Sequence, residues 1–598
     1  MQRFFHTLSD FYYHIFKKCI IFAAAKHYKH ITIMKNYLTI LAIIASTSTL
    51  FAQQSGVTVE NAGIKNAMIR VDGDHRFLLL PVEDAAPESN VRLMCDAKLE
   101  QTFNVRLAQD RVDYYMPVEL DSFKGHKILF DINEPVRNVG IGREPQWKSE
   151  VRLSDEFDTK NVEKWRPAFH HSPSYAWMND PNGMFYDDTN NTWHLYFQWG
   201  PYGSTWNNMT WRHSSSKDLI NWADEGVAIA PNALGTIFSG SCVVDKNNTA
   251  GFGKGAVIAL YTADGLSQRQ CLAYSTDGGK TFTNYAGNPI LTAGIPDFRD
   301  PNMFWNDEIN AWNLILAAGQ EMRIYSSPNL IDWKEESRFG LGFGNHAGVW
   351  ECPDLMKVDV LDEKGNKTGK QKWVLICNIN PGGPFGGSAT QYFVGSFDGH
   401  KFVCEDDAFD TKWMDYGKDH YATVSFSNAP ADRKVVMAWM SNWEYADRVP
   451  TKQFRSSNSI ARDLFLYEVK DQTYVGCRPS KEYDNGVLNQ YVKGADQTIK
   501  VAGSGSWTVS NAKGECVTIA YDAKGQTLSV VRNQDSGKVS FATQFPTVTS
   551  APVYRPLTSI RVISDNASIE VFGNNGEVCL TNLVFPSAPL TKITANKK

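Results

Sequence analysis

Hydrophobic and polar residues alternate over short runs along most of this chain, which is the pattern of half-buried β-strands. The run 102–107, in which Phe103, Val105 and Leu107 alternate with polar residues, is one example. No segment after residue 60 keeps a helical period over three turns. The sequence therefore predicts an all-β fold.

A degenerate repeat occupies the region 160–470, which is predicted to form one domain. Four copies of a Ser- and Asp/Asn-containing turn that ends in an aromatic residue lie at 215–222, 275–282, 326–333 and 395–402, each after an apolar strand. The terminal aromatics Trp222, Phe282, Trp333 and Phe402 follow one another at intervals of 60, 51 and 69 residues, the spacing of four-stranded propeller blades with loops. A fifth strand group, 434–439 with 457–466, lacks the turn. Together these groups predict a five-bladed β-propeller.

The regions on either side of the repeat also carry short strands. Residues 53–155 predict a small N-terminal domain of β-sandwich type, with a structural or glycan-docking role, and residues 478–598 predict a C-terminal β-sandwich. A chain of 598 residues is too long for one core, so several domains are expected.

The N-terminus has the features of an export signal. A basic residue near Met34, an apolar run at 37–44 and small residues up to Ala52 predict a signal peptide at 34–52. We expect a periplasmic or extracellular protein without a membrane span in the mature chain, because the apolar run is short for a span. Residues 1–33 are interpreted as an upstream extension of uncertain status.

Composition narrows the function. The net charge of −5 argues against nucleic acid as a partner, and the ten cysteines are scattered singly, which predicts neither a disulfide framework nor a metal site. Aromatic residues make up 12% of the chain, which suits β-sheet cores and surfaces that stack on sugars. No cofactor is expected, and the oligomeric state stays open.

Three Pro-associated acidic motifs lie on successive predicted blades. Asp180 lies in Trp177–Gly183, a stretch that predicts a rigid, accessible turn, while Asp300 and Glu351 precede Pro301 and Pro353. Each motif alone is more often a simple turn or strand end. Their occurrence together predicts a carboxylate site at the propeller axis.

Carboxylates in such a site suit glycoside hydrolysis by a nucleophile and an acid/base. Glu351, between Trp350 and Cys352, has apolar neighbours that favour a protonated acid, so Asp180 is the better nucleophile. Asp300 is expected to stay ionised beside Arg299 and to hold sugar hydroxyls.

These motifs resemble those of glycoside hydrolase family 32, the β-fructofuranosidases, and further similar blocks lie at 238–241, 415–422, 438–443 and 568–572. The resemblance implies a propeller followed by a sandwich, retention of configuration and no metal. It implies that Asp180 is the nucleophile, Asp300 the transition-state stabiliser and Glu351 the acid/base. The substrate contacts that it implies are Asn179, Gln198, Trp206, Ser241 and Arg299. Residues 53–155 resemble an N-terminal module of Bacteroidetes members.

Three classes of function remain open at this point: a fructan hydrolase, a fructosyltransferase on the same fold and a non-catalytic glycan-binding propeller. All three carboxylates are present, which favours an enzyme, and the export signal favours a hydrolase. The fructan linkage, β-2,6 or β-2,1, is not decided by the motifs, and sucrose is a further candidate substrate. We expect removal of single terminal fructose units from levan, in a pocket with Trp206 and Trp443 at its rim.

Overall fold

The computed structural model describes residues 51–596 except 55, 63–65, 136–143, 160–162, 534–535 and 537–540. The predicted upstream extension and all of the predicted signal peptide before Phe51 lie outside the described residues. The chain forms two compact units. One contains residues up to Leu79, Pro87–Phe103 and Glu119–Asp155, and the other contains Leu80–Ala86, Asn104–Val118 and Glu156–Lys598.

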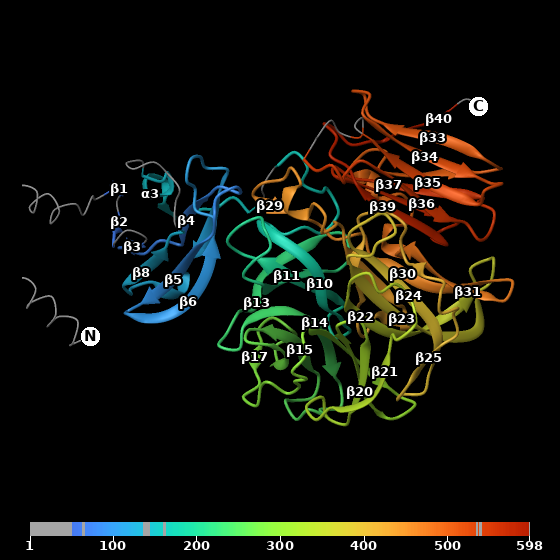
Figure 1. The fold of residues 1–598 in the computed structure, drawn as a ribbon, viewed down its shortest axis with the longest axis horizontal. Coiled ribbons are helices and arrows are strands. Elements are labelled where there is room, and N and C mark those ends of the chain that lie inside the picture. Colours follow the sequence, from blue (N-terminus) through green and yellow to red (C-terminus); the bar gives the residue numbers. More distant parts are fainter. Residues whose placement is uncertain are drawn as a thin grey trace, which may run out of the picture. The chain divides into compact units, whose positions relative to one another are not determined.

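Strands dominate the N-terminal region (Figure 1, blue). One six-stranded sheet has the order β1 (Phe51–Gln54), β2 (Val57–Asn61), β3 (Asn66–Val71), β8 (Ile128–Asn133), β5 (Ser89–Cys95) and β6 (Lys98–Val105). A second, three-stranded sheet has the order β7 (Tyr114–Glu119), β4 (Phe77–Val82) and β9 (Arg152–Ser154). The alternating burial of β5 and the burial of Phe103 and Val105 in β6 confirm the predicted strands. Helix in the described residues is limited to α3 (Trp147–Glu150) and five 3-10 turns, η1 (Asp121–Phe123), η2 (Pro430–Asp432), η3 (Ala446–Arg448), η4 (Lys481–Tyr483) and η5 (Val487–Gln490).

The region after Glu156 begins with five blades whose own strands pair antiparallel, and only β29 leaves its place in the chain order to join the first blade. Blade I contains β10 (Ala176–Asp187), β11 (Thr192–Gly200), β12 (Thr210–Ser216) and β13 (Trp222–Ile229), with β29 (Phe454–Arg455) parallel to β10. Blade II contains β14 (Thr236–Asp245), β15 (Ala256–Asp264), β16 (Gln268–Ser275) and β17 (Thr283–Asn284). Blade III contains β18 (Phe298–Asn306), β19 (Ala311–Ala318), β20 (Met322–Ser327) and β21 (Lys334–Phe339). Blade IV contains β22 (Val349–Leu361), β23 (Lys367–Asn380), β24 (Ala389–Phe397), β25 (Phe402–Cys404) and β26 (Lys412–Trp413). Blade V contains β27 (Tyr421–Ser425), β28 (Val435–Trp439), β30 (Arg462–Val469) and β31 (Gln472–Pro479).

The first strand of each blade lies innermost. Each first strand contacts the first strand of the next blade, and β27 of blade V returns to β10 of blade I, which closes the ring. The fold class predicted from the repeat, a five-bladed β-propeller, is therefore confirmed.

The repeated turn has a physical cause. In blades I to IV it joins the third strand to the outermost strand, and an Asp or Asn side chain accepts backbone N–H groups within it. Asp218 Oδ1, for instance, accepts from Ile220 and Asn221, and Asn329 Oδ1 accepts from Ile331 and Asp332. Such Asx turns satisfy backbone donors that a tight hairpin leaves free, which explains why the residue recurs.

The final region is a sandwich of two antiparallel sheets (Figure 1, orange to red). One sheet has the order β32 (Asp496–Lys500), β37 (Ser559–Ser564), β38 (Ser568–Gly573) and β39 (Val578–Leu583). The other has the order β36 (Thr547–Pro552), β35 (Thr527–Arg532), β34 (Cys516–Asp522), β33 (Gly505–Ser510) and β40 (Lys592–Ala595). An apolar core fills the space between them, and a second apolar cluster joins propeller residues such as Tyr445 to Phe545 and Phe585. Within the described residues, no helix combines the length and apolar character needed to cross a membrane.

Candidate active site

Each of the five innermost strands contains a β-bulge close to its beginning. The pairing register shifts between Met178 and Pro181 in β10, and at corresponding places in the other four strands. The residues in the bulges are Asn179-Asp180, Ser239, Asp300-Pro301, Cys352-Pro353 and Ala422-Thr423. A bulge changes the direction of a side chain relative to its strand. Five bulges at one end of the ring therefore surround a single space on the axis.

That space is a cavity of about 380 Å³. Its lining consists of Asn179, Asp180, Gln198, Trp206, Phe238, Ser239, Gln268, Asp297, Arg299, Asp300, Glu351, Asn380, Tyr421 and Trp443. The volume is at the small end of ligand pockets, which span roughly 300–1,000 Å³. It suits one or two sugar units.

The stretch around Asp180 is not the accessible turn that the sequence predicts, because β10 runs through it and the bulge supplies the change of direction. Gly183 does adopt a positive φ of 54°. A Cβ at this position would lie 2.8 Å from ring atoms of both Trp211 and Tyr196, so close packing as well as backbone conformation requires glycine.

Hydrogen bonds from two blades orient Asp180. Asn179 Nδ2 donates to Oδ1 at 3.1 Å, and Ser239 Oγ donates to Oδ2 at 2.8 Å. Trp177 in turn fixes the Asn179 amide by donating from Nε1 to Oδ1 at 2.8 Å. Burial, followed by the negative charge of Glu351, raises the pKa of Asp180, and these hydrogen bonds oppose the rise. The carboxylate is therefore held in one orientation with little freedom to turn.

The Cys352 thiol connects two of the carboxylates. Its Sγ lies 3.4 Å from Asp180 Oδ2 and 3.5 Å from Asp300 Oδ2, and its backbone N–H donates to Asp300 Oδ2 at 2.8 Å. Burial and the adjacent carboxylates raise the pKa of the thiol, so it stays protonated and can donate. Blades I, III and IV thus meet at this sulfur atom.

Glu351 has polar partners, contrary to the expectation from its sequence neighbours. Arg299 donates to Oε1 from Nε and Nη2 at 3.1 and 2.9 Å, and the Tyr421 hydroxyl hydrogen-bonds to Oε2. Trp350 packs in an apolar cluster, away from the Glu351 carboxylate, because adjacent residues of a strand face opposite sides. Arg299 also donates from Nη1 to Asp297 Oδ1 at 2.6 Å. One guanidinium is therefore shared between two acids.

The expectation that Arg299 keeps its neighbour Asp300 ionised is wrong. The guanidinium bonds to Glu351 and Asp297 instead, and although its charge lowers the pKa of Asp300, burial raises it to about 7. The opposite charge of Arg299 does act on Asp300, but burial outweighs it, and burial cannot be read from the order of residues in the chain.

Seven of the eight residues predicted for the site line the cavity, and the exception is Ser241. The Ser241 hydroxyl is buried and accepts the backbone N–H of Met303 at 2.9 Å. Ser239, two residues earlier, lies in the cavity because it is the extra residue of the β14 bulge. Among the other predicted contacts, Gln198 is 2% exposed and its Nε2 has no hydrogen-bond partner among the described residues, which leaves a donor for a ligand.

Aromatic rings form one side of the site. Trp443 stacks on Trp177 with ring centroids 5.8 Å apart, and Trp439 packs against both. Trp206 is 45% exposed and packs edge-on against Phe238. Such rings offer apolar faces to a sugar.

Several residues that line the cavity were not predicted from the sequence. Tyr421 and Ser239 lie in blocks that were noted for their family resemblance without a site role, whereas Gln268, Asp297 and Asn380 carried no signal. Asp297 could have been suspected only from its position two residues before Arg299.

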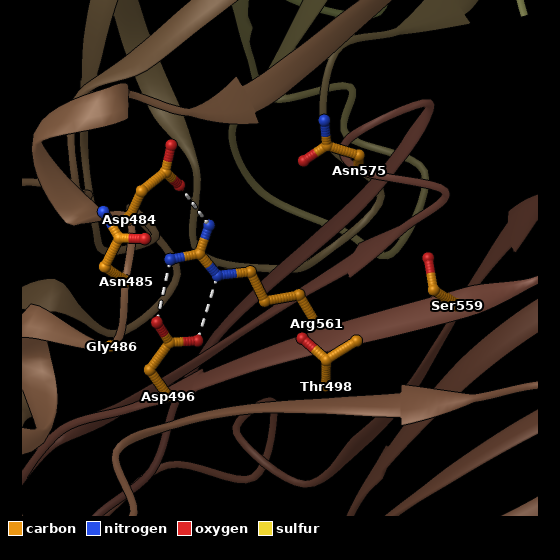
Figure 2. Close-up of a pocket in the computed structure, with 8 residues that line it drawn as sticks. All are labelled: Asp484, Asn485, Gly486, Asp496, Thr498, Ser559, Arg561 and Asn575. Carbon is orange, nitrogen blue, oxygen red and sulfur yellow. Dashed lines mark hydrogen bonds and ion pairs between the residues drawn. The ribbon is translucent and has the colours of Figure 1, made fainter. Parts of the chain in front are cut away.

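A second cavity, of about 540 Å³, lies on the C-terminal sandwich (Figure 2). Arg561 is the main charged group there, and its guanidinium is paired with Asp496 at 2.8 Å and Asp484 at 3.2 Å. No catalytic pair of carboxylates faces a free space in this cavity, so it is not the better candidate for chemistry.

A different buried charge cluster joins the propeller to the sandwich. His170 Nδ1 lies 2.8 Å from Asp565 Oδ2, and Nε2 lies 2.7 Å from Glu570 Oε1. Arg462 donates to Asp415 Oδ2 at 2.8 Å and also bonds to Glu570. All of these side chains are at most 1% exposed. Each acid in this cluster has a cationic or hydrogen-bonding partner.

Comparison with known proteins agrees with this geometry. Residues 170–477 match the model described as "Glycosyl hydrolases family 32 N-terminal domain", and residues 492–598 match "Glycosyl hydrolases family 32 C terminal". Residues 63–169 match a domain of unknown function, DUF4980.

Individual relatives extend the similarity over most of the chain. A levanase of Bacillus subtilis (strain 168) is 39% identical over 459 residues, which cover 71% of this chain and 67% of the levanase. An extracellular exo-inulinase of Meyerozyma guilliermondii is 39% identical over 480 residues, covering 71% of this chain and 90% of that protein. The crystal structure of the Aspergillus awamori exo-inulinase has a TM-score of 0.64 at 30% identity and covers 73% of this chain and 98% of its own.

Proposed function

The chain belongs to glycoside hydrolase family 32, and on that premise we propose that it releases single fructose units from β-fructans with retention of configuration. It is a glycosidase whose relatives include a levanase and exo-inulinases. The observation that carries the proposal is the meeting of three carboxylates from three blades in one sugar-sized cavity. Retaining glycosidases require a nucleophile and an acid/base on opposite sides of the scissile bond.

In the first step, an Asp180 oxygen attacks the anomeric carbon of the terminal fructosyl unit. The bond to the departing sugar breaks, and Glu351 gives its proton to the leaving oxygen. The hydrogen bonds of Asn179 and Ser239 support this assignment, because they orient the Asp180 carboxylate within the cavity.

In the second step, water attacks the same carbon from the face that the leaving group vacated. Glu351 takes a proton from that water, the ester bond to Asp180 breaks, and fructose leaves with its original configuration. Arg299 and Tyr421 fix the Glu351 carboxyl group throughout. Asp300, held by the Cys352 N–H, is proposed to bind sugar hydroxyls and stabilise the transition state.

Gln198, Trp206, Asn179 and Arg299 are proposed as substrate contacts, and Ser239 replaces Ser241 in that set. The small volume of the cavity and the rim position of Trp206 support attack at chain ends. Levan is proposed ahead of inulin as the substrate, partly on the levanase relative.

We also propose that residues 34–52 direct export and that the mature chain consists of an N-terminal β domain from 53 to 155, a catalytic propeller from 160 to 470 and a sandwich from 478 onward. The word "extracellular" in the description of the exo-inulinase relatives supports export.

The test is a time course of products from levan, inulin and sucrose, with Asp180→Ala as the control. Fructose as the sole early product, formed fastest from levan, is the expected result. The variant is expected to lose activity by a factor on the order of 10⁴ or more. A ladder of oligosaccharides in the first minutes contradicts attack at chain ends, and longer transfer products contradict hydrolysis.

A further inference from the structure

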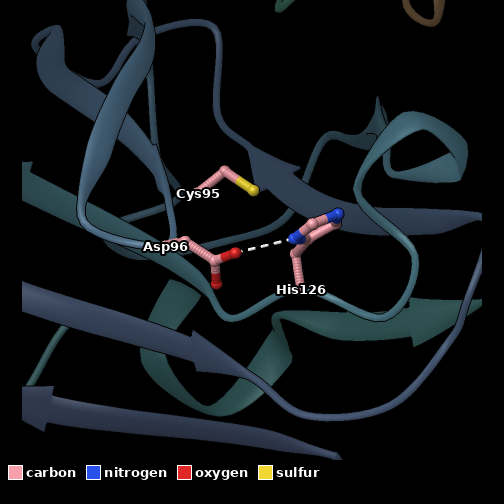
Figure 3. Close-up of side chains that lie close together, drawn as sticks. All are labelled: Cys95, Asp96 and His126. Carbon is pink, nitrogen blue, oxygen red and sulfur yellow. Dashed lines mark hydrogen bonds and ion pairs between the residues drawn. The ribbon is translucent and has the colours of Figure 1, made fainter.

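In the N-terminal region, three side chains with different donor atoms lie together outside the catalytic site. Cys95, Asp96 and His126 each contribute one atom to a group in which all three atoms lie within 4.8 Å of one another. Figure 3 shows the thiol, the carboxylate and the imidazole ring facing a common space. No metal site is predicted from the sequence because the ten cysteines are scattered singly, and Asp96 and His126 are 30 residues apart.

The fold brings these residues together through two adjacent strands. Cys95 ends β5, Asp96 begins the turn from β5 to β6, and His126 comes two residues before β8, which pairs with β5. The Asp96 backbone N–H donates to Lys127 O, and the Lys127 N–H donates back to Asp96 Oδ1, both at 3.0 Å. The relative positions of the three side chains are thus fixed by the sheet and by this reciprocal pair.

The Asp96 carboxylate also engages the imidazole ring. Its Oδ2 lies 2.7 Å from His126 Nδ1. Metal-binding histidines are commonly held by a carboxylate in this way, and both groups are themselves ligands of first-row transition ions. A turn-stabilising role accounts for the contact between Asp96 and His126, but it gives no reason for a thiol beside them.

We propose that Cys95, Asp96 and His126 form a binding site for a divalent transition ion, with Zn²⁺ as the best match. Thiolate, imidazole and carboxylate are the three protein ligand types of Zn²⁺, and three protein ligands leave the fourth tetrahedral position for water. Binding displaces the thiol proton to solvent and replaces the hydrogen bond between Asp96 and His126 by bonds to the metal.

The three side chains are accessible to an ion from solvent. Those of Asp96 and His126 are 54% and 51% exposed, and Cys95 is partly exposed. The remaining described cysteines are distributed over the propeller and sandwich, most of them buried. Cys404 is also partly exposed but belongs to no such ligand group among the described residues, so it serves as a matched control.

The test is titration of the tag-free full-length chain with Co²⁺, which reports on thiolate ligation by a charge-transfer band and on tetrahedral geometry by its visible bands. One equivalent is expected to give both signals, and Zn²⁺ is expected to displace it. Cys95→Ser should abolish the charge-transfer band, whereas Cys404→Ser should leave it unchanged. Asp96→Asn replaces a charged oxygen ligand by a neutral one and should weaken the affinity.

A second readout is independent of the cobalt spectrum. Excess Zn²⁺ should slow alkylation of Cys95, followed by mass spectrometry of its peptide, and should leave alkylation of Cys404 unchanged. A charge-transfer band that persists in Cys95→Ser would overturn the proposal, as would the absence of a band in the wild-type chain or equal alkylation with and without Zn²⁺.

Discussion

Two of the clusters of buried charge in the described part of the chain differ in the number of cations that accompany their acids. At the junction of propeller and sandwich, His170 and Arg462 are two cations that pair with three acids, Asp415, Asp565 and Glu570. Although burial opposes ionisation, Arg462 and His170 lower the pKa of Glu570 to about 2. The lining of the candidate active-site cavity contains one cation, Arg299, and four acids, Asp180, Asp297, Asp300 and Glu351. The guanidinium pairs with only two of these acids, Asp297 and Glu351. Burial there raises the pKa of both Asp180 and Asp300.

The difference shows that burial alone does not decide the protonation of a carboxyl group. The balance of charge around it does, because a buried acid without a cation of its own favours its neutral form. An excess of acids destabilises a structural junction but suits a site that has to hold and release a proton.

The largest effect is expected from replacing Glu351, the proposed proton donor. Glu351→Gln should slow hydrolysis of levan roughly 10²–10⁴-fold, the usual contribution of general acid catalysis. Aryl fructosides with good leaving groups need little protonation, so the variant should cleave them at a rate much closer to that of the wild type. Steady-state rates on both substrates check this expectation. Equal losses on both would remove Glu351 from the role of acid.

Substitutions at the junction are expected to change the stability of the protein and not its activity. Arg462→Met leaves Asp415 buried without its cation and leaves Glu570 with His170 alone, which should reduce the free energy of unfolding by about 3–5 kcal/mol. Arg338→Met is the control, because Arg338 is 51% exposed and its ion pairs are screened by solvent, so the substitution should change the stability little. Denaturant titration measures both. A rate constant per folded molecule that falls in Arg462→Met would contradict the separation of the two clusters.

The junction also predicts a dependence of stability on pH. Burial opposes the charge on His170, but hydrogen bonds to Asp565 and Glu570 raise its pKa from 6.5 to about 9. Because the pKa is higher in the folded state, this contribution is complete below pH 6.5 and is lost as the pH rises to 9, with a limit of about 3 kcal/mol. Unfolding free energies at pH 6, 7.5 and 9 measure it. His170→Asn should be less stable at pH 6 and should flatten the profile, and an unchanged slope in the variant would contradict the assignment.

The smallest effect is expected on the acidic side of the pH profile of kcat/KM. Ser239 donates to Asp180, and its hydrogen bond opposes the raised pKa of that carboxylate. Ser239→Ala should therefore move the acid limb of kcat/KM to higher pH by up to about one unit. Ser241→Ala provides the matched control, since Ser241 does not line the cavity. A larger shift in Ser241→Ala than in Ser239→Ala would favour Ser241, and not Ser239, as the serine that acts on Asp180.

The fold and the three acidic residues that line the cavity could be predicted from the sequence, because both depend on local patterns. Asx turns between the outer strands repeat with Asp218 and Asn329, and Asp180 and Asp300 each precede a proline, so short motifs were sufficient. Partners were harder to predict. The Arg299 guanidinium reaches Glu351, 52 residues away, and the Ser239 hydroxyl reaches Asp180, 59 residues away.

The bulges explain most of the side-chain positions that could not be predicted from the sequence. A shift of one residue in β14 brings Ser239 instead of Ser241 into the cavity, and a similar shift in β18 places Asp300 in the bulge, where its carboxylate accepts the Cys352 N–H. Alternation along a regular strand predicts neither result. His170 and Glu570, 400 residues apart, are likewise paired only by the packing of the sandwich on the propeller.

The most direct test of the central claim, that the unmatched carboxylates divide into a nucleophile and an acid, is to trap the covalent intermediate. The Glu351→Gln chain is mixed with an activated aryl fructoside, quenched with acid within the first turnover and digested for mass spectrometry. The account predicts one fructosyl group on the peptide that contains Asp180. An enzyme that turns over without any fructosyl peptide, or one that carries the sugar on Asp300, would contradict it.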